Sequence, residues 1–468
     1  MAGSYCRCIR FLLVFIVLLH VHGGHSQPCD PADLAALLAF SDGLDTKGAG
    51  LVGWGPNGTS CCSWTGVSCD LGRVVELDLS NRSLSRNTLG GEALAQLGRL
   101  SSLRHLDLSA NGLTGAFPAS GGGGFPAIEV VNVSSNGFTG PHPVFPGAPN
   151  LTVLDITNNA FSGGINVTVL CSSPVRILRF SANAFSGDVP AGFGLCKVLT
   201  DLFLDGNGLT GSLPKDLYMM PMLRRLSLQE NELSGSLNED LGNLSELMQI
   251  DLSYNMFKGT IPDVFGKLRR LESLNLASNW FDGTLPLSLS HCPMLRVVSL
   301  RNNSLSDEIA IDFSLLPKLN TLNVGTNRLH GAIPPGLALC TELRTLNLAR
   351  NNLQGELPES FKNLRSLSYL SLAGNGLTNL SSALQILQHL PKLTILVLTK
   401  NFRNGETMPM DGIRGFKSMQ VLALAGYIPT AGQFSTFPDS SFVGNPALCL
   451  RWNQACYKRV VTTEMRQY

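Results

Sequence analysis

Apolar and polar residues alternate along this chain in a pattern that repeats, L-x-x-L-x-L-x-x-N-x-L-x-G-x-I-P. A clear copy runs from Leu271 to Pro286. The asparagine of the pattern recurs at steps of 25, 23, nine times 24, and finally 26 residues. Arg82 and Tyr427 fall in the same register at the two ends, which gives about fifteen repeat units, the last of them disrupted. The register asparagines are Asn111, Asn136, Asn159, Asn183, Asn207, Asn231, Asn255, Asn279, Asn303, Asn327, Asn351, Asn375 and Asn401.

Each unit predicts one short β-strand, because the leucines of x-L-x-L-x alternate and therefore point to one side. A single strand cannot bury that side alone, so neighbouring units must stack in parallel and share a continuous core. The period and the G-x-I/L-P ending are those of plant leucine-rich repeats. The sequence therefore predicts an α/β repeat solenoid over residues 73–431, a plant-type leucine-rich-repeat superhelix with a parallel β-sheet on its concave face.

The other residues that recur in each unit have physical roles. We expect the asparagine amide to bond to backbone groups of its own coil and the adjacent coil, forming a ladder. An unpaired amide there would cost about 1–3 kcal/mol per buried group. The glycine permits a tight turn, and the proline closes a second short strand.

Residues 1–26 have the features of a secretory signal peptide. Arg7 and Arg10 precede the apolar run 11–19. Gly24 and Ser26 are the small residues expected before a signal-peptidase cleavage site between Ser26 and Gln27. The alternative is an uncleaved membrane anchor. No later run of about twenty apolar residues predicts a transmembrane helix. The sequence thus favours a secreted, extracellular protein of the apoplast.

Cysteines and glycosylation motifs agree with that route. Once Cys6 and Cys8 leave with the signal, ten cysteines remain in an oxidising compartment, where disulfides persist. Cys171 and Cys196 occupy similar places in adjacent repeats and are candidates for a bridge. Cys292 and Cys340 lie two repeats apart and are expected to be free and buried. Eight N-x-Ser/Thr motifs predict N-glycosylation, at Asn57, Asn81, Asn132, Asn150, Asn166, Asn243, Asn302 and Asn379.

Composition and motifs argue against catalysis and against nucleic acid as a partner. The formal net charge is only +1, which gives no electrostatic drive toward phosphate backbones. The histidines after the signal fall in five separate repeats, and none shares a register with a nucleophile and an orienting acid. Gly206–Gly211 matches G-x-G-x-x-G only because a chance glycine falls in the repeat pattern. No enzyme, cofactor or metal site is predicted.

Inward-facing strand positions change character along the array. The first half carries acids at Glu76, Asp78, Asp107, Asp155, Asp201, Asp205 and Asp251, whereas from Ser273 onward these positions hold no acid. Arg301 stands there among hydroxyls and amides. Such a surface predicts an extended, anionic peptide ligand bound on the concave side. The alternative is that small polar residues are simply tolerated on a solvated face.

The two ends resemble the caps of plant repeat proteins. In residues 27–72, a helical segment from Asp33 to Phe40 precedes Cys61-Cys62-Ser-Trp-Thr-Gly-Val-Ser-Cys69, which resembles the plant N-terminal cap. That resemblance implies the disulfides Cys29–Cys61 and Cys62–Cys69. Residues 432–456, with Gly444–Cys449, resemble the matching C-terminal cap and imply a Cys449–Cys456 disulfide. Residues 457–468 form a polar tail.

Several longer segments resemble the ectodomains of phytosulfokine receptors: Asn347–Asn352, Glu359–Leu364, Leu380–Gln385, Leu396–Phe402, Gly405–Met410 and Gly432–Phe437. The resemblance extends over residues 27–456 and is most specific at 340–425. Members of that family bind a short tyrosine-sulfated peptide on the inner face and recruit a co-receptor kinase. By position, the resemblance places ligand contacts at Arg301, Asn347, Ser371 and Thr399.

The chain departs from that family after Gly426. The family has further repeats and an island segment there, followed by a membrane helix and a serine/threonine kinase, whereas this sequence passes directly to Tyr427-Ile-Pro429. A splice variant, a gene fragment and an error in the gene model would each produce such a junction. Because the island is missing, we expect a truncated or decoy receptor with weak or no hormone binding. A non-functional fragment is a further alternative. If the missing membrane helix belongs to the true product, the plasma membrane is the expected location. A different function, inhibition of microbial cell-wall hydrolases by a secreted repeat protein, is the alternative.

Overall fold

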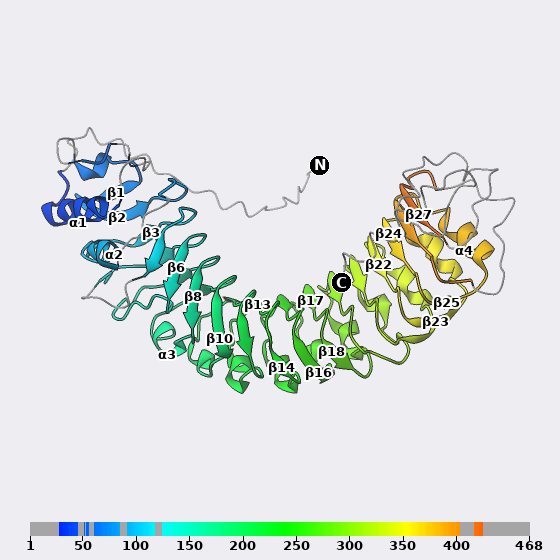
Figure 1. The fold of residues 1–468 in the computed structure, drawn as a ribbon. Helices are drawn as coiled ribbons and strands as arrows, with labels where there is room; N and C mark the ends of the chain where they lie inside the picture. The colour runs from blue at the N-terminus through cyan, green and yellow to red at the C-terminus, as the bar shows by residue number, and fades with distance from the viewer. Residues whose placement is uncertain are drawn as a thin grey trace, which may run out of the picture.

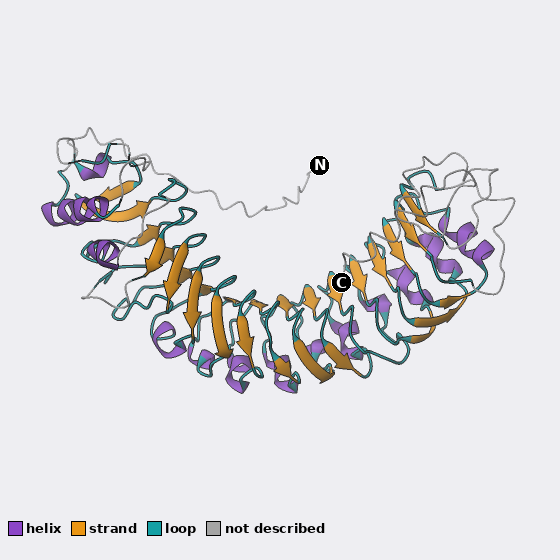
Figure 2. Ribbon diagram, viewed as in Figure 1, coloured by secondary structure: helices purple, strands orange, loops and turns teal. Residues whose placement is uncertain are grey.

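The computed structural model describes residues 28–44, 51, 53–55, 60–84, 91–117, 124–402 and 416–424. These residues form a single curved solenoid whose longest sheet lines the inside of the arc (Figure 1). Short helices and irregular segments cover the outside of the arc (Figure 2). The predicted leucine-rich-repeat superhelix with a parallel sheet on its concave face is therefore confirmed.

The concave sheet has sixteen strands, arranged in the order of the sequence. β1 and β2 form an antiparallel pair, and every later neighbour is parallel. In the regular part, each residue faces its equivalent in the next repeat, as Leu322 faces Leu346. The strands are β1 (Val67–Asp70), β2 (Arg73–Asp78), β3 (His105–Asp107), β5 (Val130–Asn132), β7 (Val153–Asp155), β9 (Ile177–Arg179), β11 (Asp201–Phe203), β13 (Arg225–Ser227), β15 (Gln249–Asp251), β17 (Ser273–Asn275), β19 (Val297–Ser299), β20 (Thr321–Asn323), β22 (Thr345–Asn347), β24 (Tyr369–Ser371), β26 (Ile395–Val397) and β27 (Val421–Ala423).

Second short strands follow many of the register asparagines and form three smaller sheets. The five-stranded sheet contains β4 (Thr114–Ala116), β6 (Gly137–Gly140), β8 (Ala160–Gly163), β10 (Ala184–Asp188) and β12 (Gly208–Thr210). The two three-stranded sheets contain β14 (Ser234–Gly235), β16 (Met256–Thr260) and β18 (Trp280–Asp282), and β21 (His330–Ala332), β23 (Asn352–Gly355) and β25 (Gly376–Leu377).

Helical turns close the repeats on the outer side (Figure 2). The α-helices are α1 (Pro31–Asp42), α2 (Gly91–Leu97), α3 (Val167–Leu170) and α4 (Leu380–Leu387). The 3₁₀ turns are η1 (Cys61–Ser63), η2 (Phe193–Leu195), η3 (Lys215–Met219), η4 (Glu239–Asn243), η5 (Phe265–Lys267), η6 (Leu287–His291), η7 (Phe313–Leu315), η8 (Pro335–Leu339) and η9 (Glu359–Asn363). They complete a core in which the strand leucines, such as Leu346 and Leu348, are fully buried.

The predicted asparagine ladder is present along the array. The Asn351 Nδ2 donates to Val324 O at 3.0 Å and to Leu348 O at 3.1 Å. Its Oδ1 accepts from Leu329 N in the preceding coil at 3.0 Å. Asn327 repeats the arrangement one coil earlier, with Leu300 O, Val324 O and Leu305 N. Each amide thus joins two coils and satisfies backbone groups that the turn leaves without a strand partner.

The N-terminal cap is fixed to the first strands by a buried carboxylate. Helix α1 begins after Asp30, whose side chain accepts from Ala32 N and Asp33 N. The fully buried Asp33 accepts from Arg73 Nε at 2.9 Å, Arg73 Nη2 at 3.0 Å and Val74 N at 2.8 Å. The sequence predicted a helix here, but this contact with β2 was not foreseen.

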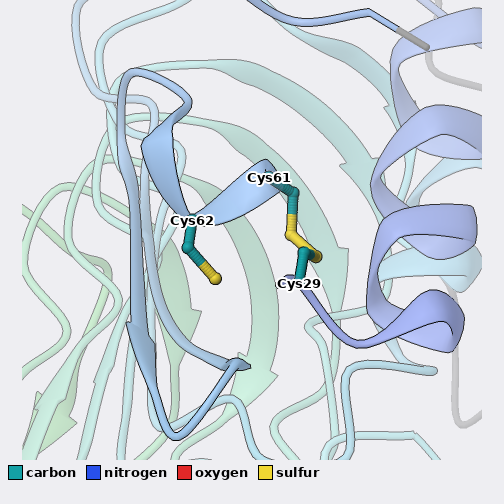
Figure 3. A group of neighbouring side chains, drawn as sticks. All are labelled: Cys29, Cys61 and Cys62. Atoms are coloured by element: carbon teal, nitrogen blue, oxygen red, sulfur yellow. A yellow bond between two sulfur atoms is a disulfide. The ribbon is translucent and has the colours of Figure 1, made fainter. Parts of the chain in front are cut away.

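Two disulfides complete the cap, Cys29–Cys61 and Cys62–Cys69, which are the pairs that the cap resemblance implied. The sulfurs of Cys29, Cys61 and Cys62 gather within 4.8 Å of one another (Figure 3). All three are already bonded in disulfides, so this cluster is a covalent staple and offers no thiolate to a metal. The Cys29–Cys61 disulfide holds the start of α1 against η1 at one end of the solenoid.

The remaining cysteines of the described residues divide into one bridge and two thiols. Cys171 at the end of α3 is bonded to Cys196 at the end of η2. Cys292 and Cys340 are free and buried. Burial raises the pKa of the Cys292 thiol to about 11 and that of Cys340 to about 12, so both remain protonated and unreactive.

His142 is a buried neutral histidine that joins two coils. Its Nε2 accepts from Asn166 N at 2.9 Å, and its Nδ1 lies 2.9 Å from Pro143 O. These partners require the proton on Nδ1. The ring also packs against Phe180 and Phe185. Burial lowers the pKa of His142 because the charged form loses its solvation.

The lowered pKa of His142 predicts that acid destabilises the solenoid. The unfolded chain takes up this proton below about pH 6.5, whereas the folded chain resists it. The contribution of neutral His142 to the free energy of unfolding is therefore fully present above that pH. It declines as pH falls toward the pKa of His142 in the folded chain, by at most about 1.4 kcal/mol per pH unit. Thermal unfolding of His142→Gln between pH 7 and 5 should show a flatter profile than the wild type. The exposed His105→Gln is the control. Parallel profiles for wild type and His142→Gln would contradict the assignment.

Candidate ligand-binding face

Each repeat presents three side chains to the concave side. They are the first and third residues of the strand and the second residue after it, here called positions 1, 3 and 5. In β22 these are Thr345, Asn347 and Ala349, all half-buried, whereas Leu346 and Leu348 between them are fully buried. This alternation follows from the strand geometry, as the sequence predicted.

Aspartate and asparagine at position 3 have a structural role. Their side-chain oxygen accepts from the backbone N–H at position 5 of the same repeat, at 2.8 to 3.2 Å, and so closes the end of the strand. The residues that do so are Asp78, Asp107, Asn132, Asp155, Asp251, Asn275, Asn323 and Asn347. The sequence interpretation of these side chains as surface groups for a ligand missed this bond.

The acids of the first half are also bonded to the next coil. The second carboxylate oxygen of Asp107 accepts from Asn132 Nδ2 at 2.9 Å. That of Asp251 accepts from Asn275 Nδ2 at 2.8 Å. Asp155 and Asp201 are paired with arginines. Most of the acidic half is therefore an internal hydrogen-bond network across the strands, with few carboxylates left for a partner.

Asn323 and Asn347 differ from the asparagines of the first half. Their Oδ1 atoms accept from Gly325 N at 3.2 Å and Ala349 N at 3.0 Å. Among the described residues, neither Nδ2 has an acceptor, because position 3 of the preceding strand holds Ser299 or Asn323 where the first half has an acid. Two amide N–H₂ groups on adjacent strands are thus available to a ligand.

Arg301, at position 5 of the β19 repeat, is an exposed cation on the same face. No carboxylate of the described residues pairs with it, unlike Arg179 and Arg225. Gly325, Ala349 and Ala373 occupy position 5 of the next three repeats, and the half-buried Thr399 follows. From Gly325 to Thr399, position 5 is consequently a track of small residues, with the donors Asn323 and Asn347 beside it at position 3.

Ser371 is the exception among the expected contact residues. It was expected to lie on the exposed face, but it is only 5% exposed. In the sheet it stands between Asn347 and Val397, at the same position of the neighbouring strands. Both neighbours have longer side chains than serine, so the hydroxyl lies at the floor of the track. The structure thus brings Arg301, Asn347 and Thr399 to one accessible face and places Ser371 beneath it.

The glycosylation motifs occupy different environments. Asn81, Asn150, Asn166, Asn243 and Asn302 are exposed. Asn379 is half-buried and begins α4, where its side chain accepts from Ser382 N. Asn132 is half-buried on the concave sheet, and its Nδ2 already donates to Asp107. A glycan is therefore expected at the exposed sites and disfavoured at Asn132. Asn57, the signal peptide 1–26, and Cys449 and Cys456 of the predicted C-terminal cap lie outside the described residues.

Models of known families match parts of the chain. A leucine rich repeat N-terminal domain matches residues 30–70. Leucine rich repeat models match residues 221–281 and 341–402, and further repeat models match 102–123 and 291–314. These matches correspond to the cap and to the repeats seen in the structure.

The similar proteins of known identity are plant receptors. The chain is 39% identical over 158 residues to the brassinosteroid LRR receptor kinase BRL3 of Oryza sativa subsp. japonica, which is 32% of this chain and 12% of that protein. It is 39% identical over 168 residues to phytosulfokine receptor 1 of Arabidopsis thaliana, 35% of this chain and 14% of that protein. The matched stretches therefore span only a small part of these relatives.

Solved structures agree with these relatives. The ectodomain of GASSHO1/SCHENGEN3 from Arabidopsis thaliana, in complex with CASPARIAN STRIP INTEGRITY FACTOR 2, matches with a TM-score of 0.66 and 32% identity, over 76% of this chain and 42% of that one. The peptide hormone receptor RGFR1, in complex with RGF2, matches with a TM-score of 0.63 and 28% identity, over 76% of this chain and 61% of that one. Within the described part of the chain, no helix has the length and apolar character needed to cross a membrane.

Proposed function

We propose that this leucine-rich-repeat chain, which resembles the ectodomains of plant receptor kinases, is an extracellular module that binds an extended anionic peptide along the concave face from β19 to β26. The observation that carries the proposal is the set of unpaired donors on this face. Arg301, Asn323 and Asn347 present N–H groups for which the described residues hold no acceptor.

The chemistry of these donors favours a ligand rich in acceptors. Hydrogen bonds from a guanidinium to a carboxylate or sulfate are charge-assisted, each contributing about 1.5–3 kcal/mol. The amides of Asn323 and Asn347 lie on neighbouring strands, about 4.8 Å apart. Carbonyl and carboxylate groups of an extended peptide running across the strands are suitable acceptors for these amides. A sulfated peptide, as the family resemblance implies, would place its sulfate at Arg301.

The same resemblance suggests a signalling role in a plant. The chain would act at the cell surface or as a secreted decoy that sequesters the peptide or a co-receptor kinase ectodomain. Because the sequence skips the family's island segment, we expect weaker binding of a tyrosine-sulfated pentapeptide than a phytosulfokine receptor would show. An affinity equal to that of such a receptor would contradict this expectation.

Titration of the full chain with a tyrosine-sulfated pentapeptide and its unsulfated form tests the proposal. We expect the sulfated form to bind about tenfold or more tightly, a difference of about 1.4 kcal/mol or more. Arg301→Gln should abolish this preference. The control, Arg328→Gln, removes the same charge from an exposed arginine of the next repeat, which lies outside the concave strands. Equal affinity for both peptides would contradict the proposal.

A second variant separates recognition from folding. Asn347→Asp keeps an oxygen for Ala349 N, as Asp107 and Asp251 do at the same position, but replaces the donor by a negative charge. We expect an unchanged melting temperature and an affinity for the sulfated peptide reduced about tenfold or more. Full retention of binding by this variant would exclude Asn347 from the ligand site.

A further inference from the structure

A second group of side chains on the concave face, in the middle of the array, has no part in the site proposed above. Phe203 stands at position 3 of β11 and is half-buried. Its ring lies between two guanidinium groups from the neighbouring strands. The Arg179 Cζ is 5.9 Å from the ring centroid and the Arg225 Cζ is 5.8 Å from it. The ring thus holds both cations by cation–π contacts on the sheet surface.

Each guanidinium is also held from below by a carboxylate. Arg179 Nη1 is 3.3 Å from Asp155 Oδ2, and Arg225 Nε is bonded to Asp201 Oδ1. The arginine side chains are 39% and 44% exposed, whereas those of Asp155 and Asp201 are 15% and 6% exposed. The cations therefore face the concave space while the acids lie beneath them, although the pairs are balanced in charge.

This arrangement leaves donors in a fixed geometry. A guanidinium carries five N–H donors, and among the described residues only one donor of each arginine has a carboxylate partner. Asp205, the other acid of β11's repeat, accepts from Ser181 Oγ at 2.7 Å. A carboxylate that docks against the exposed Nη atoms of either arginine would meet preordered N–H groups, with little side-chain entropy to lose.

We infer that Arg179, Phe203 and Arg225 form a second anion-recognition site, which takes a carboxylate of an extended peptide ligand. The inference rests on the proposed function for the position of the ligand's other anion, at Arg301. Three strand steps separate β13 from β19. At about 4.8 Å per step the distance across the sheet is about 14 Å, and position 1 and position 5 are offset by about 13 Å along the strand direction. An extended peptide spans the resulting separation of about 19 Å in about five to six residues. The face therefore selects peptides with two anionic groups at that separation.

Two synthetic peptides of identical composition test this spacing. One is Ac-Gly-Glu-Gly-Ser-Gly-Ser-Glu-Gly-amide, and the other has its two glutamates adjacent. With the full chain at low ionic strength, fluorescence anisotropy should give the spaced peptide an affinity about tenfold higher, since only it reaches both sites. Arg179→Gln/Arg225→Gln should remove this advantage. The matched control, Arg176→Gln/Arg224→Gln, removes the same charges from exposed arginines of the same two repeats and should keep it.

The variants also distinguish this inference from the proposed function. Arg179→Lys/Arg225→Lys keeps both ion pairs and the fold but loses the planar donors, and should bind the spaced peptide several-fold more weakly. If Arg179→Gln/Arg225→Gln binds like the control while Arg301→Gln weakens binding, the second site is excluded and the proposed function stands. If Arg179→Gln/Arg225→Gln weakens binding of the spaced peptide and Arg301→Gln does not, the second site stands and the proposed function fails. Equal affinity of the wild type for both peptides, or none for either, would overturn the inference.

Discussion

Asn351→Ala is expected to lower the free energy of unfolding of the central repeats by about 2 kcal/mol or more. The substitution leaves Leu329 N without its acceptor. It also removes one of the two amide bonds to Val324 O and to Leu348 O, which keep those from Asn327 and Asn375. Each unsatisfied buried group costs about 1–3 kcal/mol, and a water in the vacated space would recover part of it. Since contacts in a solenoid are made only between neighbours, the loss should be concentrated in β20 to β24.

Hydrogen exchange with urea denaturation measures this effect locally. The control is Asn352→Ala, which makes the same change one residue later, at an exposed position of β23. We expect the control to stay within about 0.5 kcal/mol of the wild type. Similar exchange rates in the two variants would show that the amide ladder does not hold the coils together.

Asp33→Ala should release the N-terminal cap, with a loss of about 2–3 kcal/mol in cap stability. The carboxylate is fully buried and accepts from both Arg73 and Val74 N. Its removal leaves Val74 N without an acceptor, and leaves Arg73 with Ser101 and with Asp30, which is 3.8 Å away. The loss is smaller than for a fully buried ion pair, because the Arg73 side chain is 34% exposed and keeps Asp30 nearby. The Cys29–Cys61 disulfide keeps the helix tethered, so the expected change is fraying of α1 and β2 within an intact array.

Limited proteolysis and thermal unfolding report this fraying. Asp42→Ala is the control, because Asp42 is an exposed acid at the other end of α1. We expect the protease to cleave Asp33→Ala on the N-terminal side of β3 at a temperature at which Asp42→Ala is not cleaved. Equal resistance of the two variants would mean that the disulfides and apolar packing hold the cap without Asp33.

The repeat pattern predicted the fold because one physical constraint recurs in every unit. Leu346 and Leu348 are buried and Asn351 bridges coils for the reasons that spacing alone provides. The helix at the cap was predicted too, although its buried contact with Arg73 was not, since the partners are separated by 40 residues. A pairing of that kind depends on how the cap docks on the first strand, which no local pattern specifies.

The candidate site was predicted less completely. Register placed Arg301 and Asn347 on the concave face, but it could not show that Ser371 lies below its longer neighbours. It also treated the acids of the first half as independent charges. Asp107 and Asp251 already accept hydrogen bonds from the end of their own strand and from the asparagine of the next coil. One signal was available in the sequence: an asparagine follows an acid at position 3 in those repeats, whereas Asn347 follows Asn323.

The cluster around Phe203 was missed for a similar reason. Arg179 and Phe203 occupy position 3, whereas Arg225 and Asp201 occupy position 1, so the group crosses both strands and positions. A reading of one position at a time does not connect them. An aromatic residue at an inward position with arginines in both adjacent strands is the pattern that would have found it.

Photo-cross-linking of the full chain with a tyrosine-sulfated pentapeptide that carries a benzophenone tests the central claim most directly. If unpaired donors on the concave face bind the peptide, mass spectrometry should place the cross-links on β19 to β26, and Arg301→Gln should reduce them. Cross-links on the outer turns η6 to η9, undiminished in Arg301→Gln, would contradict that claim.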